Sequence, residues 1–107
     1  MRMSPRDMQL LRRREDRIPM EIPVVLDGHR QVPGSESTFT ENVSVKGARV
    51  ISVRRWETGS PVVFASRTGE FRSAARVAYC QPIRGDGFAI GVESLETKGR
   101  WVVESTN

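Results

Sequence analysis

Apolar and polar side chains alternate most regularly over residues 71–80, a pattern typical of a strand with one face against a core. Phe71, Val77 and Tyr79 share the predicted core side of this strand, so we expect Tyr79 to be buried. The same alternation returns over residues 88–92, after a turn that contains two glycines. Two alternating segments joined by such a turn predict a β-hairpin.

Four further short segments also have the composition of strands: 22–26, 37–43, 48–53 and 61–66. Pro19 and Pro23 place the first of them at a sheet edge or at an entry into the sheet. Turn-forming residues separate the segments at intervals of about ten residues. Six short strands with this spacing, and no second long helical period, predict an all-β fold: a closed or nearly closed six-stranded antiparallel barrel.

The two ends of the chain follow different patterns. Ser4 and Pro5 combine a cap residue with a proline at the first helical position, which signals a helix start. The helix this predicts, over about 5–13, is too short to be stable alone in water, so we expect a flexible or short-helical arm. Residues 100–104 are predicted to form an extra strand or a short helix that covers one barrel end. The resulting division is an N-terminal arm (1–17), a barrel (18–96) and a C-terminal extension (97–107).

Length and composition fit one folded domain in a reducing compartment. The chain has 107 residues, of which 37% are hydrophobic and 28% charged, which suits one core and argues against wholesale disorder. It contains no apolar run of the roughly 20 residues that a membrane helix needs, and its N-terminus lacks a signal-peptide pattern. Cys80 is expected to be a packed core thiol, since it has no partner for an internal disulfide. We expect a cytoplasmic protein without membrane insertion.

Catalytic and metal-binding side chains are scarce. His29 is the only histidine and Cys80 the only cysteine, so neither a His/Cys metal cluster nor a histidine-assisted nucleophile can be assembled. No glycine-rich phosphate loop opens a helix. We therefore predict a protein that is not an enzyme and that needs no metal or cofactor.

Positive charge is concentrated at the N-terminus. The formal net charge is +4, and residues 1–17 alone contribute +3, from six arginines and three acids. An anionic partner is therefore expected to meet this arm first. Arginine outnumbers lysine 15 to 2 in the whole chain. A guanidinium group pairs bidentately with a phosphate or with a guanine edge, whereas an ammonium group is only a point charge.

Two clusters stand apart from ordinary barrel patterning. The first lies immediately before the first predicted strand and contains Arg13 and Arg17, four residues apart, with Arg12 beside them. Residues at that spacing lie on one side of a helix or turn, so both guanidinium groups can reach one ligand. Taken alone, the cluster is also consistent with a solvated basic arm.

The second cluster consists of Asn42, Ser44 and Gly47. Asparagine and serine side chains donate and accept hydrogen bonds, and Gly47 allows a positive φ or a close backbone approach. These properties suit an exposed loop around the polar edges of a ligand. Taken alone, the segment is also consistent with an ordinary Asx or Ser turn between strands.

In combination, an arginine pair before the first barrel strand and an [Asp/Asn]-x-Ser-x-x-Gly segment about 25 residues later resemble the PilZ domain family of bacterial cyclic di-GMP receptors. The resemblance extends over about 11–95. It implies a six-stranded barrel whose outer face, with the N-terminal arm folded over it, holds cyclic di-GMP. The implied ligand-binding residues are Arg12, Arg13, Arg17, Asn42, Ser44 and Gly47. Asn42 departs from the aspartate frequent in the family, and so gives up a charge-assisted acceptor for a guanine N–H.

The resemblance also implies a mechanism in which the arm becomes ordered on ligand binding and presents a new surface to a downstream protein partner. Two alternatives remain. A small basic barrel that binds DNA or RNA would use the same arginines, but Phe71, Tyr79 and Phe88 look internal by periodicity, which leaves few aromatics for base stacking. Nucleic acid is therefore the weaker candidate partner. A PilZ-like scaffold that has lost its ligand and binds only proteins is the other alternative, and the presence of both clusters argues against it.

Overall fold

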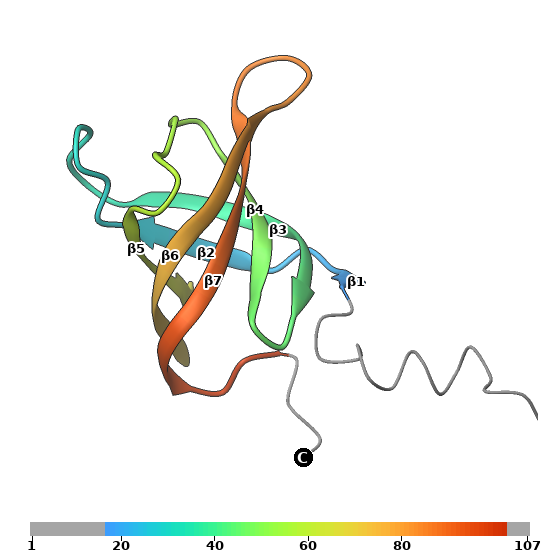
Figure 1. The fold of residues 1–107 in the computed structure, drawn as a ribbon. Helices are drawn as coiled ribbons and strands as arrows, with labels where there is room; N and C mark the ends of the chain where they lie inside the picture. The colour runs from blue at the N-terminus through green and yellow to red at the C-terminus, as the bar shows by residue number, and fades with distance from the viewer. Residues whose placement is uncertain (1–16, 103–107) are drawn as a thin grey trace, which may run out of the picture.

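Every regular element in the part of the chain described by the computed structural model, residues 17–102, is a β-strand (Figure 1). The strands are β1 (Ile18–Pro19), β2 (Pro23–Asp27), β3 (Glu36–Ser44), β4 (Gly47–Ser52), β5 (Pro61–Ser66), β6 (Phe71–Pro82) and β7 (Phe88–Gly99). The six predicted strands correspond in order to β2 through β7. The helix predicted over 5–13 lies outside the described residues.

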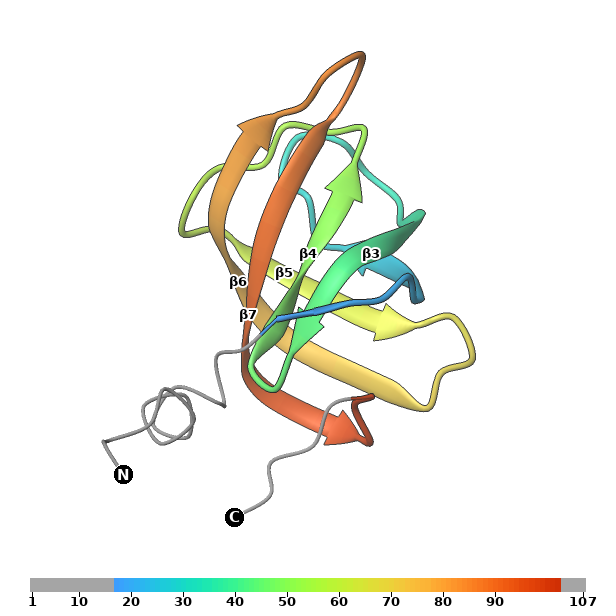
Figure 2. The same ribbon diagram turned by 90° about the vertical axis from the view of Figure 1, so that its right-hand side faces the viewer.

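Strands β2 to β7 close into a six-stranded antiparallel barrel, as predicted (Figures 1 and 2). The pairing order is β3-β2-β5-β6-β7-β4, and a further pairing of β4 with β3 closes the sheet. The short strand β1 was not predicted. It pairs with the end of β3, where Ile18 lies opposite Val43 and Pro19 opposite Asn42. This pairing carries the chain just before β1 alongside the β3–β4 turn.

Side chains at alternate strand positions fill the barrel interior. The largest wholly buried ones include Leu26, Phe64, Phe71 and Ile90. Burying one such side chain contributes about 1.5–3 kcal/mol to folding, so these positions are the main source of stability. Because this interior is occupied by packed side chains, polar residues that recognise a ligand have to lie on the outer face.

After β7 the chain crosses one end of the barrel. Trp101 is only 8% exposed, and its ring centroid lies 4.5 Å from that of Phe71 and 5.4 Å from that of Phe64. Its indole Nε1 donates a hydrogen bond of 2.7 Å to the carbonyl oxygen of Ser44. Residues 100–102 therefore cover the barrel end as predicted, but as irregular chain, so the strand and the helix considered for them are both wrong. The remainder of that segment, 103–104, lies outside the described residues.

A β-bulge in β6 overturns the prediction that Tyr79 belongs to the core. The β6–β7 register shifts between Val77 and Tyr79, which leaves Ala78 as an extra residue. Val77 still faces inward, opposite Val92, but Tyr79 pairs with Gly91 on the outer face. The Tyr79 ring covers Gly91 so closely that a Cβ there would overlap the ring carbons. The apolar alternation continues through the bulge, so the sequence pattern does not reveal the switch of faces.

Three further observations bear on the expectations from composition. No helix within residues 17–102 is long and apolar enough to cross a lipid bilayer. The same residues contain no group of three or more His, Cys, Asp or Glu side chains placed to hold a metal ion. Cys80 is a half-buried free thiol that packs against the core.

Candidate functional site

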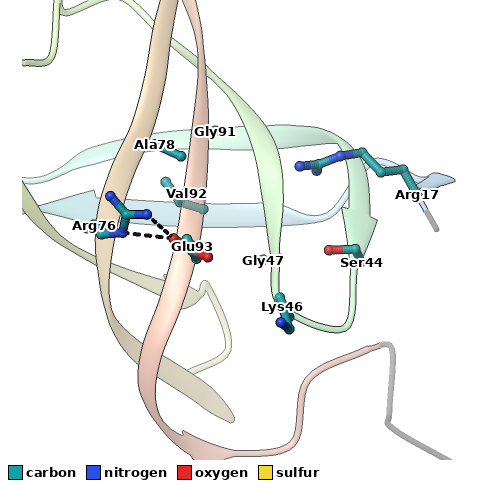
Figure 3. Close-up of a pocket in the computed structure, with 9 residues that line it drawn as sticks. All are labelled: Arg17, Ser44, Lys46, Gly47, Arg76, Ala78, Gly91, Val92 and Glu93. Atoms are coloured by element: carbon teal, nitrogen blue, oxygen red, sulfur yellow. Dashed lines mark hydrogen bonds and ion pairs between the residues drawn. The ribbon is translucent and has the colours of Figure 1, made fainter. Parts of the chain in front are cut away.

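A cavity of about 420 Å³ opens on the outer face of the barrel beside the β3–β4 turn (Figure 3). Strands β3, β4, β6 and β7 contribute to its walls, together with the residue just before β1. The lining residues are Arg17, Ser44, Lys46, Gly47, Arg76, Ala78, Gly91, Val92 and Glu93. In Figure 3 the Arg17 and Ser44 side chains approach the cavity from one side, and Arg76 and Glu93 lie on the opposite side.

Arg17 reaches the cavity because β1 begins directly after it and pairs with the end of β3. Its Nη1 donates a hydrogen bond of 3.0 Å to the side-chain oxygen of Asn42. Both groups are accessible to water, so this bond contributes little to folding, but it fixes the direction of the guanidinium group. Asn42 is therefore a partner of Arg17 and does not itself line the cavity.

Ser44 presents a hydroxyl group to the cavity although the residue as a whole is only 5% exposed (Figure 3). Within residues 17–102 no hydrogen-bond partner engages this hydroxyl, which leaves it available to a ligand. The carbonyl group of Ser44 accepts the Trp101 indole hydrogen bond. The backbone of Ser44 is thus fixed by Trp101, which covers the barrel end.

Gly47 is required by the packing of β4 against β7. It lies opposite Glu93, and a Cβ at this position would overlap the backbone carbonyl oxygen of Val92. Its φ is not in the left-handed region, so of the two roles expected for this glycine the close backbone approach applies. Here the approaching backbone belongs to the protein's own strand. A second consequence is that no side chain fills the cavity at this point.

Arg76 and Glu93 form an ion pair on the far wall of the cavity (Figure 3). The Nε and Nη2 atoms of Arg76 lie 2.8 and 2.6 Å from the same oxygen, Oε1 of Glu93. The two residues are opposite each other in the β6–β7 register and both face outward. Each is at least 40% exposed, so the pair adds little to stability, in keeping with surface ion pairs generally.

The cavity lining carries a net positive charge. Arg17, Lys46 and Arg76 contribute three positive charges and Glu93 one negative charge, which gives +2 for the lining residues in the described part of the chain. Charges of one sign in a concave surface attract an oppositely charged ligand and raise its local concentration. The wall is therefore suited to a small anion with two or more negative charges.

A second polar network adjoins the cavity on the outer face. The Nε of Arg49 donates a hydrogen bond of 2.7 Å to Glu41, and its Nη1 donates bonds of 3.2 Å to the Tyr79 hydroxyl and 3.1 Å to Gln81. The hydrogen bonds to Glu41 and then Tyr79 raise the pKa of Arg49 above its usual value. Arg49 therefore stays charged, and it fixes the hydroxyl end of the outward-facing Tyr79 ring.

The structure brings Arg17, Ser44 and Gly47 together on one cavity, and it links Asn42 to them through Arg17. The other two residues of the predicted site, Arg12 and Arg13, lie outside the described residues.

Sequence reasoning missed Lys46, Arg76 and Glu93 as cavity residues. Lys46 lies between Ser44 and Gly47 of the second cluster, so its place in the sequence was a usable signal. The two others look like ordinary outward-facing strand residues in the sequence. Only the pairing of β7 with both β4 and β6 places Glu93 beside Gly47 and Arg76.

Comparison with known proteins gives one match. A model of a protein family, the PilZ domain, matches residues 11–100 of the chain. No curated protein and no solved structure matches it. The matched segment includes the cavity lining and all six barrel strands.

Proposed function

Because the chain belongs to the PilZ domain family, we propose that it is a receptor for cyclic di-GMP and that the ligand binds in the outer cavity. PilZ domains are binding modules. One observation carries the proposal: Arg17 and Ser44, which come from clusters about 25 residues apart in the sequence, line the same positively charged cavity.

The functional groups of cyclic di-GMP match those of the cavity lining. Cyclic di-GMP presents two phosphates and two guanine bases. A bidentate arginine–guanine pair supplies about 1–3 kcal/mol of discrimination, and a micromolar complex requires about −8 kcal/mol in total. A total of this size can be supplied by Arg17, the Ser44 hydroxyl and the positive charges of the cavity lining, together with Arg12 and Arg13 from the arm.

Asn42 and Gly47 have indirect roles in this proposal. Asn42 orients Arg17 through a neutral acceptor, so the guanidinium charge is not neutralised before the ligand arrives. Gly47 leaves the cavity open next to Ser44, since it adds no side chain.

The proposed output is a change in the N-terminal arm, residues 1–17. The arm folds over the barrel of residues 18–96 when the dinucleotide binds, and the ordered arm gives a downstream protein partner a new surface. Arm ordering costs conformational entropy, which the phosphate and guanine contacts offset. No catalysis is part of this proposal. Of the predicted C-terminal extension, 97–107, the first three residues complete strand β7, and the rest is proposed to extend the barrel. The free thiol of Cys80 fits a cytoplasmic site of action in a bacterium.

Isothermal titration calorimetry of the full chain with cyclic di-GMP tests the proposal. We expect micromolar binding, at least tenfold weaker binding of cyclic di-AMP and GTP, and loss of binding in Arg17→Ala. Arg84→Ala is the matched control, since it removes the same charge from the exposed β6–β7 turn, outside the cavity lining. Equal binding by Arg17→Ala and Arg84→Ala would refute the proposed site.

The same titration separates the alternatives. A nucleic-acid binder would bind long polyanions with an affinity that falls steeply with salt and would not prefer cyclic di-GMP. A scaffold without a ligand would give no heat with any of the nucleotides. Either result would contradict the receptor function.

A further inference from the structure

An arginine can pair with the O6/N7 edge of a guanine, but contact with the N1–H and N2–H groups on its other edge requires a hydrogen-bond acceptor. A carboxylate is a good match for these two donors, because its oxygens are charged acceptors and it carries no donor. Position 42 does not supply one, since Asn42 is an amide and its oxygen already accepts from Arg17. A carboxylate that contacts these two groups would therefore have to come from elsewhere in the cavity lining.

Among the cavity-lining residues within 17–102, Glu93 is the one that carries a carboxylate. Its Oε1 accepts both contacts from Arg76, and within residues 17–102 no donor engages its Oε2. Figure 3 shows this second oxygen directed away from Arg76. A carboxylate held at one oxygen has a fixed direction, and its other oxygen remains ready to accept.

The surroundings of Glu93 leave room for a planar base. The residue directly opposite on β4 is Gly47, which has no side chain, and Ala78 contributes only a methyl group to the neighbouring wall. The Arg17 guanidinium and the Ser44 hydroxyl line the other side of the same cavity. A dinucleotide in the cavity could therefore place its phosphates near the cationic side chains and one of its bases near the Glu93 carboxylate.

We propose that Glu93 is the guanine-reading residue of this cavity and that Arg76 is its positioning residue. The inference rests on the proposed function and goes beyond it, because neither residue belongs to the two sequence clusters. Arg76 holds Oε1, and Oε2 accepts from the N1–H and N2–H groups of one guanine. The opposite hypothesis is that Glu93 only neutralises Arg76. In that case its removal would change the binding of every dinucleotide to the same extent.

Calorimetry with two ligands and the variant Glu93→Gln distinguishes these hypotheses. The second ligand is cyclic di-IMP, whose bases keep N1–H but lack the N2 amino group. Glutamine keeps the oxygen that Arg76 holds and puts an NH₂ donor where Oε2 was, so donor would face donor. We expect the wild-type chain to prefer cyclic di-GMP by about tenfold, and Glu93→Gln to bind cyclic di-GMP at least about tenfold more weakly and to lose most of the preference.

Glu96→Gln is the matched control, because Glu96 is an exposed glutamate on the same strand and does not line the cavity. The affinity of Glu96→Gln for cyclic di-GMP, and its preference for cyclic di-GMP over cyclic di-IMP, should equal those of the wild type. Arg76→Met tests the positioning role. If Arg76 positions Glu93, the ratio of the affinities for cyclic di-GMP and cyclic di-IMP should fall. If Arg76 only contacts a phosphate, the affinities for both ligands should fall by the same factor. Thermal unfolding of each variant shows that the barrel is intact.

The possible failures are distinguishable. If the wild-type chain does not bind cyclic di-GMP, the proposed function fails and this inference fails with it. If the wild-type chain binds and Glu93→Gln weakens both ligands by the same factor, the receptor function stands and the role given to Glu93 is wrong. If Glu93→Gln loses the preference for cyclic di-GMP over cyclic di-IMP but Arg76→Met keeps it, Glu93 contacts the base without help from Arg76, and the positioning role of Arg76 is wrong.

Discussion

Trp101 connects the stability of the barrel to the shape of the cavity, and Trp101→Phe tests this connection. The substitution keeps an aromatic ring against Phe64 and Phe71 but removes the indole N–H that donates to the Ser44 carbonyl at 2.7 Å. Losing a typical hydrogen bond costs about 0.5–1.5 kcal/mol, and a buried acceptor left unpaired costs about 1–3 kcal/mol. We expect a loss of about 2 kcal/mol in the free energy of unfolding. In a barrel of this size that corresponds to a fall of about 10 °C in Tm.

Urea and thermal unfolding measure the stability, and a titration with cyclic di-GMP measures the effect on the cavity. Trp56→Phe is the matched control, because Trp56 is 3% exposed and its Nε1 donates a hydrogen bond of 3.0 Å to the Ser52 hydroxyl, away from the cavity lining. Both variants should lose stability. Only Trp101→Phe should also weaken ligand binding, by several-fold, because it frees the backbone of Ser44.

Two results would refute this reasoning. A change of less than about 0.5 kcal/mol in Trp101→Phe would mean that the indole hydrogen bond contributes nothing beyond packing. Equal ligand affinity in the Trp101 and Trp56 variants would mean that Ser44 is held in place without the chain that follows β7.

Two further predictions concern the glycines of the outer face. Gly47→Ala should destabilise the barrel by more than about 2 kcal/mol in urea unfolding, because its Cβ would overlap the backbone of β7. Gly85→Ala, at a positive φ of 84° with open space around it, should cost only about 1 kcal/mol, and equal losses in the two variants would contradict the overlap. Gly91→Ala should destabilise the wild type more than it destabilises Tyr79→Ala, since the overlapping atoms belong to the tyrosine ring. A double-mutant cycle with additive losses would show that the ring moves aside freely.

Most of the fold follows from local patterns. The alternation of apolar residues located β6 and β7, and short β-branched segments between turn residues located the other four barrel strands. Closure into a barrel follows because six short antiparallel strands with one apolar face each have no other way to bury that face without exposed edges. The pattern failed at Tyr79, because a single extra residue reverses the face of everything after it without changing the alternation that a reader of the sequence sees.

The candidate site was predictable only in part, for a physical reason of the same kind. Arg17, Ser44 and Gly47 belong to compact sequence clusters, so their residue types and spacing were visible in the sequence. Arg76 and Glu93 are single charged residues on the solvent side of their strands, where charged residues are expected in any barrel. What makes them part of the cavity is the register between β4, β7 and β6, and register depends on pairings between distant segments.

Under the proposed function, the packed interior explains why an N-terminal arm would be needed to complete the site. In a small barrel the inward side chains occupy the space, so a ligand binds on the outer sheet surface, where it is covered from one side only. The described part of the cavity lining supplies cations, one hydroxyl group and one carboxylate on the outer sheet surface. A receptor of the proposed kind would gain affinity by folding further chain over the ligand. The residues before Arg17 carry five arginines against three acids and directly precede a residue of the cavity lining. Under the proposed function, the segment that would complete the site is therefore also the one whose movement would report that the site is filled.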